Sequence, residues 1–255
     1  MIIGVNTAPE DTVAPQDERY LRKVLAHARQ LQTRARFVVF TREHNHDRFE
    51  GWPRIPLRDR GLFGGGASLD AAIKQAQANA LLSPLGHAPA RAPVPQVLYC
   101  THLAPWQDEQ GKLRARARPR TLRKTCANAH AIVVASKYLR HKCLDFFGAA
   151  LDRTVVAPAA AEDIFEDAHR PIVEPPYFLV LSDPLTRPWA ARPGRAFREH
   201  IDEFPYTIVV AGGREDDAPD AWGPRKVHVE QCAEPHLAAL YRHAALFLYP
   251  ALHDG

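Results

Sequence analysis

Short apolar runs that do not alternate with polar residues are the feature that most restricts the fold of this chain. Residues 36–41, 96–100, 131–135, 177–181 and 206–211 are runs of this kind. A strand buried on both faces needs apolar side chains on both sides, and such strands occur in parallel sheets. Several of the runs are followed by a polar loop and by apolar residues at helical spacing. The pattern predicts an α/β protein in which helices connect parallel strands.

The segments between the apolar runs allow two helices to be placed in the first third of the chain. We expect one helix from about residue 17 to residue 32 and another from Ser68 or Asp70 to about Leu82. Residues 42–66 are polar and rich in Arg, Gly and Pro, so we expect an irregular loop there.

Three prolines mark the best candidate for a linker. They lie within residues 166–176, which show no apolar period, and a fresh strand–helix series begins directly after them. The 255 residues are enough for two modest domains. We therefore predict an N-terminal domain over residues 1–170 and a second domain over residues 171–255.

Composition favours a chain without membrane spans or bound metal. No apolar run approaches the roughly 20 residues of a membrane-spanning helix. Residues 1–6 lack the basic and long apolar regions of a signal peptide, so we expect a cytoplasmic protein. The four cysteines are widely spaced with no C-x-x-C pair, which predicts small buried hydrophobes and no metal site.

The last segment, residues 234–255, carries the strongest motif. Glu234 and Pro235 open an expected helix, and residues 246–249 predict a strand buried on both faces that delivers a polar His-Asp-Gly beyond its end. The segment resembles retaining GT-B glycosyltransferases, in particular glycosyltransferase family 4. The matching positions are Leu237, Leu240, Tyr241, Ala244, Pro250, Asp254 and Gly255.

A second segment, residues 128–165, resembles the same family. Its apolar run leads to Ser136, a good N-cap for a helix over residues 137–147, and Gly148 is a candidate for the left-handed residue after that helix. The resemblance implies a GT-B-like fold of two Rossmann-like parallel-sheet domains facing a cleft, the second of them incomplete. In that fold the first domain is on the acceptor side and the second binds the donor.

The resemblance also implies a set of site residues. His102, after the strand at residues 96–100, and Asp254 would be the catalytic residues beside the sugar. Arg187 would neutralise the donor diphosphate, and Gly212 and Gly213 would also bind the donor. The implied reaction is transfer of a hexose from a nucleotide-diphosphate sugar to a glycan or lipid-linked hydroxyl acceptor, with retention and without a cofactor. This chemistry belongs to glycan or polysaccharide biosynthesis.

Several positions differ from the family and leave a second function open. Pro188 stands where the family has a Lys, residues 7–16 contain no Gly, and the family continues to a second Glu beyond the position of Gly255. We therefore expect a fragment or shortened enzyme that binds nucleotide sugars weakly or not at all. The alternative is a non-catalytic, degenerate GT-B protein that acts as a binding or partner subunit.

The most basic segment runs from Lys112 to Lys124 and contains seven Lys and Arg residues. No aromatic residue is interleaved with them, so we expect no nucleic-acid partner. One interpretation is a solvated loop and helix face. The other is attraction to an anionic acceptor or to acidic lipid, giving peripheral contact with the inner face of the membrane.

Overall fold

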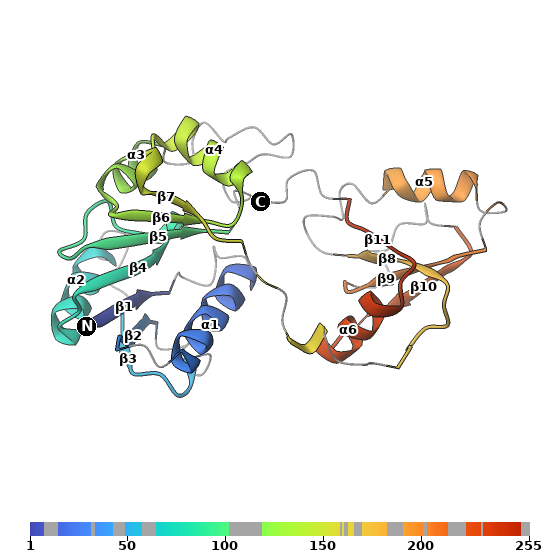
Figure 1. The fold of residues 1–255 in the computed structure, drawn as a ribbon, viewed down its shortest axis with the longest axis horizontal. Helices are drawn as coiled ribbons and strands as arrows, with labels where there is room; N and C mark the ends of the chain where they lie inside the picture. The colour runs from blue at the N-terminus through green and yellow to red at the C-terminus, as the bar shows by residue number, and fades with distance from the viewer. Residues whose placement is uncertain are drawn as a thin grey trace. The chain divides into compact units, whose positions relative to one another are not determined.

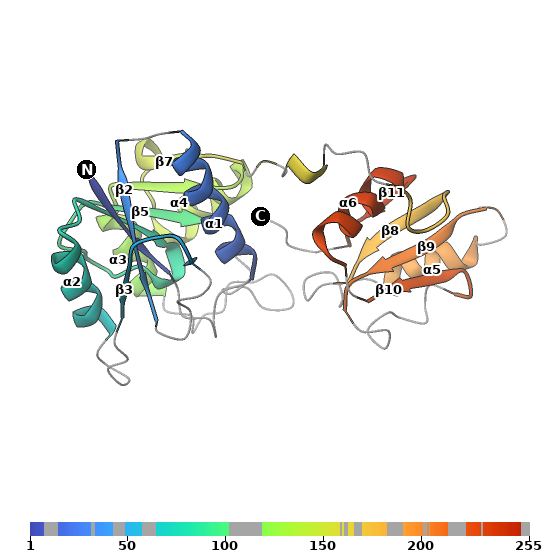
Figure 2. The ribbon, with the colours of Figure 1, turned by 90° about the horizontal axis from the view of Figure 1, so that it is seen from below.

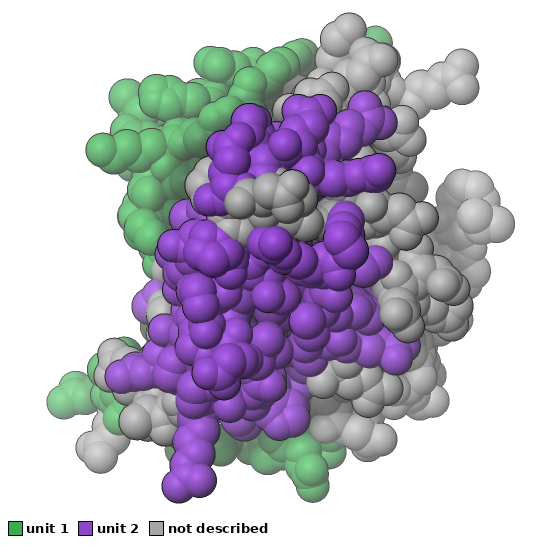
Figure 3. Space-filling model, turned by 90° about the vertical axis from the view of Figure 1, so that its right-hand side faces the viewer, with its two compact units in different colours: residues 1–159, 255 green, residues 160–254 purple. Residues whose placement is uncertain are grey.

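A computed structural model describes residues 1–7, 15–31, 34–42, 49–57, 65–101, 119–158, 160, 163–165, 170–182, 191–200, 203, 205–213, 223–230 and 232–250. The chain divides into two compact units, Met1–Ala159 and Ala160–Asp254 (Figure 3). Each unit contains one parallel sheet with helices packed on it (Figures 1 and 2). The predicted α/β class with two parallel sheets is confirmed.

The first unit is built on seven strands in the order β3-β2-β1-β4-β5-β6-β7, and every neighbouring pair is parallel. Its elements are β1 (Ile2–Asn6), α1 (Pro15–Gln30), β2 (Arg36–Thr41), β3 (Arg54–Pro56), α2 (Gly65–Ala76), β4 (Ala80–Pro84), η3 (Leu85–His87), β5 (Gln96–Cys100), α3 (Pro119–Asn128), β6 (Ala131–Val134), α4 (Lys137–Phe147), η5 (Leu151–Arg153) and β7 (Thr154–Val156).

Helices cover both faces of this sheet. On one face, Leu21 and Leu25 of α1 pack against Val5 and Val39. On the other face, α3 and α4 pack over β5 and β6, opposite α1 (Figure 1). The strands are therefore buried on both sides, which explains why their sequences are apolar without alternation.

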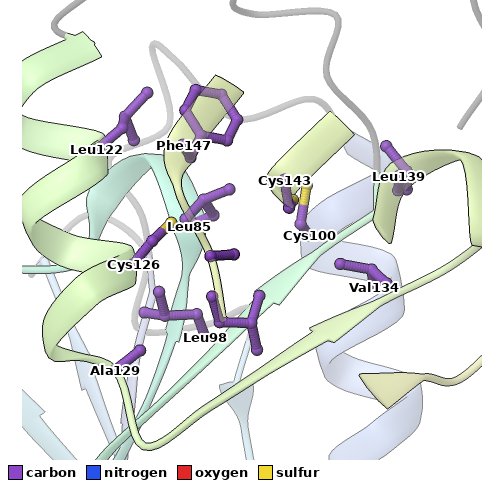
Figure 4. Close-up of a cluster of buried hydrophobic side chains, with 12 residues drawn as sticks. Leu85, Leu98, Cys100, Leu122, Cys126, Ala129, Val134, Leu139, Cys143 and Phe147 are labelled. Atoms are coloured by element: carbon purple, nitrogen blue, oxygen red, sulfur yellow. The ribbon is translucent and has the colours of Figure 1, made fainter. Parts of the chain in front are cut away.

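The core under α3 and α4 contains three of the four cysteines (Figure 4). Cys100, Cys126 and Cys143 are at most 4% exposed and pack among leucines, as small hydrophobes do. Burial raises the pKa of the Cys126 thiol to about 12, with a smaller contribution from Cys143. The prediction that these cysteines are buried hydrophobes is confirmed.

The boundaries of α4 follow from its two flanking residues. The Ser136 Oγ accepts a hydrogen bond from the Leu139 N–H at 3.1 Å, which satisfies one of the free donors of the first turn. Gly148 adopts the left-handed conformation at φ 64°, and its N–H donates to the Cys143 carbonyl. Both predicted caps are confirmed.

The predicted helix ending near Leu82 is wrong at its C-terminal end. The helix stops at Ala76, Gln77 turns the chain at φ 51°, and Ala80–Pro84 forms β4. This strand pairs with β1 on one side and β5 on the other. Sheet pairing on both edges overrides the helical spacing of the same apolar residues. The expected irregular loop at residues 42–66 also contains the short edge strand β3.

The second unit has four parallel strands in the order β10-β9-β8-β11. Its elements are η6 (Asp163–Phe165), β8 (Tyr177–Leu181), α5 (Ala191–Glu199), β9 (Thr207–Ala211), β10 (Lys226–Val229), α6 (Glu234–His243) and β11 (Leu246–Leu248). Phe197 of α5 packs on one face of this sheet and Leu240 of α6 on the other. The arrangement repeats β3-β2-β1-β4 of the first unit, with a helix after the first strand and another before the fourth.

The prediction that residues 246–249 form a strand buried on both faces is corrected. β11 forms at Leu246–Leu248, but Leu246 is 47% and Phe247 38% exposed. Among the residues that the structure describes, β11 pairs with β8 alone. Its counterpart β4 in the first unit also pairs with β5 on its other edge. The exposure follows from this position at the edge of the sheet.

Tyr177 offers a test of how α6 is attached to the second sheet. Its side chain is fully buried, and its hydroxyl donates to the Leu240 carbonyl at 2.8 Å. Removal of such a bond in Tyr177→Phe is expected to cost about 0.5–1.5 kcal/mol of unfolding free energy at neutral pH. Urea titrations of the two proteins measure this difference.

The free energy of unfolding of wild type should fall more steeply at alkaline pH than that of Tyr177→Phe. Burial raises the pKa of Tyr177 above its ordinary value. The stabilisation is therefore fully present below the unfolded pKa of about 10 and is lost as pH rises through the folded value. The difference between wild type and Tyr177→Phe should shrink above about pH 10. Tyr138→Phe, at a position 43% exposed, is the control and should leave the free energy of unfolding at neutral pH within about 0.5 kcal/mol of wild type. A difference that stays constant to high pH would contradict the buried hydroxyl bond.

Candidate functional site

The carboxyl edge of the second sheet brings three chain segments together. Because β8, β9 and β10 are parallel, the loops that follow them leave from the same edge. The Ser182 N–H donates to the Ala211 carbonyl and the Gly212 N–H to the Val229 carbonyl, each at 2.9 Å. The hydrogen bonding between the strands thus continues one residue beyond β8 and one residue beyond β9. It holds Ser182 and Gly212, the residues that follow these two strands, next to the neighbouring strand.

The turn after β9 consists of two glycines. Gly212 has φ 84° and Gly213 φ 68°, the left-handed region that favours glycine. A Cβ atom on Gly212 would lie 3.4 Å from the Ser182 carbonyl oxygen, tighter than most side-chain contacts. The backbone is therefore bare of side chains at this point, and a ligand can approach it closely.

Ser182 contributes a buried hydroxyl beside this turn. Its Oγ has no hydrogen-bond partner among the described residues. A buried hydroxyl left unpaired costs about 1–3 kcal/mol, so most such groups find a partner in the protein, in water or in a ligand. The hydroxyl lies at the carboxyl end of a parallel strand, the edge at which open α/β folds bind their ligands.

Two further residues hold the glycine turn, and sequence reasoning did not single them out. The His228 Nε2 donates to the Gly212 carbonyl at 3.0 Å, which requires the proton on that ring nitrogen. The Cys232 Sγ donates to the Val229 carbonyl at 3.7 Å. Burial raises the pKa of Cys232, so the thiol stays neutral at physiological pH. The available signal for His228 was a histidine between two valines in a short strand.

The carboxyl edge of the first sheet carries its own polar residues. The Asn6 Nδ2 donates to the His87 carbonyl at 3.2 Å, and the Thr7 Oγ1 donates to the Phe40 carbonyl at 2.9 Å. The Ser83 Oγ near the end of β4 is fully buried and has no partner within the described part of the chain. Thr101 follows β5 directly. The sequence signal for these residues is a polar side chain within one residue of the end of a strand.

Solved structures with similar folds include glycosyltransferases. The glycosyltransferase from Rickettsia africae ESF-5 matches with a TM-score of 0.66 at 8% identity, over 96% of this chain and 72% of that chain. The glycotransferase of kitacinnamycin matches with a TM-score of 0.54 at 14% identity, over 97% and 75%. The chain has a GT-B-like fold.

The same fold is shared by an enzyme named for a different reaction. The UDP-GlcNAc 2-epimerase of Methanocaldococcus jannaschii matches with a TM-score of 0.56 at 10% identity, over 97% of this chain and 77% of that chain. No protein-family model and no curated protein sequence matches this chain. The GT-B-like fold is therefore established, while the resemblance to family 4 remains a prediction.

Within this GT-B-like fold, the predicted donor-binding glycines lie at the carboxyl end of β9, next to the end of β8. His102, Arg187 and Asp254 lie outside the described residues, so their roles remain predictions. His102 comes one residue after Thr101 at the first edge, and Arg187 follows Ser182 at the second.

The described part of the chain contains neither a membrane-spanning helix nor a metal-binding cluster. No described helix is both long enough and apolar enough to cross a membrane. Across the described ranges, no three His, Cys, Asp or Glu side chains are grouped so that they could hold a metal ion.

Proposed function

We propose that this chain acts in glycosyl transfer, moving a hexose from a nucleotide-diphosphate sugar to a hydroxyl of a glycan or lipid-linked acceptor with retention of configuration. The observation that carries the proposal is the bare glycine turn at Gly212 and Gly213 beside the unpartnered Ser182 hydroxyl. This combination lies at the carboxyl edge of a parallel sheet, where open α/β folds bind their ligands.

The chemistry assigns a role to each segment around this turn. A nucleoside diphosphate is the leaving group, and its developing negative charge needs fixed cations or hydrogen-bond donors. Arg187 supplies the cation from the loop after β8, and the glycine turn lets the diphosphate approach the backbone. Asp254 binds hydroxyls of the sugar, and His102 lies beside the sugar from the acceptor side. Residues 171–255 are the donor domain and residues 1–170 the acceptor domain.

The solved structures of similar fold support a nucleotide-sugar ligand. They include proteins named as glycosyltransferases and one named as a UDP-GlcNAc epimerase. We place the reaction in the cytoplasm, in glycan or polysaccharide biosynthesis, with contact to the inner membrane face when the acceptor is lipid-linked. The second candidate, a non-catalytic binding subunit, is favoured by Pro188 at the position of the expected Lys.

Calorimetric titration with UDP-, GDP- and ADP-sugars tests the proposal. We expect binding to one nucleotide class, weakened about ten- to a hundredfold by the missing Lys, since one charge-assisted contact is worth roughly 1.5–3 kcal/mol. Gly212→Ala should weaken binding further, because it places a Cβ atom at φ 84° and 3.4 Å from the Ser182 carbonyl.

The matched control for this titration is Gly148→Ala. Gly148 also lies in the left-handed region, but a Cβ atom there would meet nothing within 4 Å. It should leave nucleotide-sugar affinity unchanged. If wild type binds none of the nucleotide sugars at millimolar concentration, the transfer function is contradicted and the non-catalytic alternative holds.

A further inference from the structure

His228 reaches from β10 to the glycine turn at the end of β9, its neighbour in the sheet (Figure 2). It lies opposite Val210, and its Nε2 donates to the Gly212 carbonyl at 3.0 Å. The next residue of β10, Val229, accepts the Gly212 N–H at 2.9 Å. Two consecutive residues of β10 therefore hold both hydrogen-bonding groups of Gly212.

The turn needs this support because it consists of glycines. Gly212 and Gly213 have φ 84° and 68°, and glycine has more backbone freedom than any other residue. A turn of this kind explores many conformations unless hydrogen bonds restrict it. The bond from His228 restricts the peptide group between the two glycines.

The direction of the Gly213 N–H follows from that restriction. The Gly212–Gly213 peptide is trans, so its carbonyl and its N–H point in opposite directions. The carbonyl is directed at the His228 ring, and the N–H is therefore directed away from it. Among the described residues, no backbone acceptor is paired with this N–H. It is a fixed donor at the carboxyl edge of the sheet, where open α/β folds bind their ligands.

We propose that His228 is a positioning residue, which fixes the Gly213 N–H as a hydrogen-bond donor to a phosphate oxygen of a nucleoside diphosphate. The choice of ligand rests on the proposed function, in which a nucleoside diphosphate is the leaving group. Backbone N–H groups in turns with left-handed residues bind anionic oxygens. A donor that is already oriented stabilises the developing charge without reorganising during the reaction.

A purely structural role in joining β10 to β9 is the other explanation for the bond. The two strands are already paired at four positions, from Lys226 with Ile208 to Val229 with Ala211. The Gly212 N–H continues this pairing without the imidazole. Loss of the ring should therefore release the turn and leave the strand pair formed.

One NMR signal reports the bond and the donor together. In the full chain carrying glycine labelled in carbon and nitrogen, only Gly65, Gly66 and Gly213 have an amide that follows a labelled carbonyl. The correlation of the Gly213 amide with the Gly212 carbonyl shows the His228 bond in the carbonyl shift and ligand binding in the amide shift. We expect inorganic pyrophosphate to move the amide signal downfield, because a hydrogen bond to an anionic oxygen is short and strong.

Two substitutions at His228 separate its hydrogen bond from its other contacts. His228→Ala removes the donor and should weaken binding of pyrophosphate and of UDP, GDP or ADP roughly five- to tenfold in calorimetric titration, since the Gly213 N–H remains but must be ordered on binding. His228→Gln keeps an N–H donor at the end of its side chain and should retain affinity within about twofold. The Gly212 carbonyl shift should change in the alanine variant and stay near wild type in the glutamine variant.

His200→Ala is the matched control in the same unit. The His200 Nδ1 also makes a hydrogen bond, to the Glu203 Oε1 at 3.0 Å. His200 lies between the end of α5 and the start of β9, and β9 begins at the edge of the sheet opposite the glycine turn. Its loss should therefore leave ligand affinity and the Gly213 correlation unchanged. Urea titration of each variant measures any loss of folding stability.

Unchanged affinity in His228→Ala, or a Gly213 amide that does not respond to a bound ligand, would overturn the proposal. Equal weakening in His228→Gln would do so too, and so would failure of pyrophosphate and all three nucleoside diphosphates to bind wild type. Pyrophosphate binding without binding of any nucleotide sugar would contradict sugar transfer and leave the role of His228 in place. Binding of a nucleotide sugar with an unmoved Gly213 amide would do the reverse.

Discussion

Leu98→Ala is expected to lower the free energy of unfolding of the first unit by about 2–5 kcal/mol. Leu98 is 0% exposed and lies in the centre of β5, paired with Ser83 of β4 and Ile132 of β6. Its side chain packs in the core beneath α3 and α4 (Figure 4). Truncation leaves a cavity between a sheet and two helices, which close-packed neighbours fill only in part.

Leu151→Ala is the matched control for this prediction. Leu151 lies in η5 of the same unit and is 58% exposed, so the same truncation removes little buried area. We expect a change within about 0.5 kcal/mol for this surface substitution. Urea titrations followed by circular dichroism and by fluorescence compare the two variants. Equal losses would show that β5 is not at the centre of the folded core.

Arg187→Ala is expected to lower kcat/KM for sugar transfer about 10²–10³-fold, the usual cost of removing one group that stabilises transition-state charge. β8 ends next to the glycine turn at the end of β9, and Arg187 follows Leu181 by six residues in the sequence. In the proposed site, Pro188 stands at the next position, where the resembled family has a Lys. Release of nucleoside diphosphate from the donor that titration identifies measures the rate.

Two companion variants make the Arg187 prediction specific. Arg198→Ala removes an exposed Arg from α5 of the same unit and should leave the rate unchanged. Pro188→Lys restores the cation pair of the resembled family and is expected to raise kcat/KM by about tenfold or more, since a charged hydrogen bond is worth roughly 1.5–3 kcal/mol. Equal rates for wild type and Arg187→Ala would remove Arg187 from the site.

Five strands were predictable because each is an apolar run of the length that a doubly covered sheet needs. Tyr177–Leu181 and Gln96–Cys100 occur where the sequence indicates them. The α4 helix was predictable to the residue, because Ser136 and Gly148 mark its ends by local hydrogen bonding and by backbone conformation. Such signals act within a few residues, so they need no knowledge of the rest of the chain.

The places of two strands in their sheets could not be predicted in the same way. Ala80–Pro84 has helical spacing as a sequence but becomes a central strand, because β1 and β5 satisfy its backbone on both sides. Leu246–Leu248 has the composition of a central strand but lies at an edge with β8 as its described neighbour. In both cases the partner decides the outcome, and the partner is distant in the sequence.

The sequence by itself determined the α/β class, the two series of parallel strands and the two ends of α4, because hydrophobic period and capping are local properties. Only the tertiary structure decided which polar groups meet. It placed the Ser182 hydroxyl beside the Gly212 turn, and it brought Arg123 of α3 to the Phe146 carbonyl of α4. The basic residues of α3 have no aromatic residue interleaved with them in the sequence, yet the fold places Phe146 of α4 beside Arg123. Long-range packing produces such combinations, because it joins residues whose side chains carry no local signal for one another.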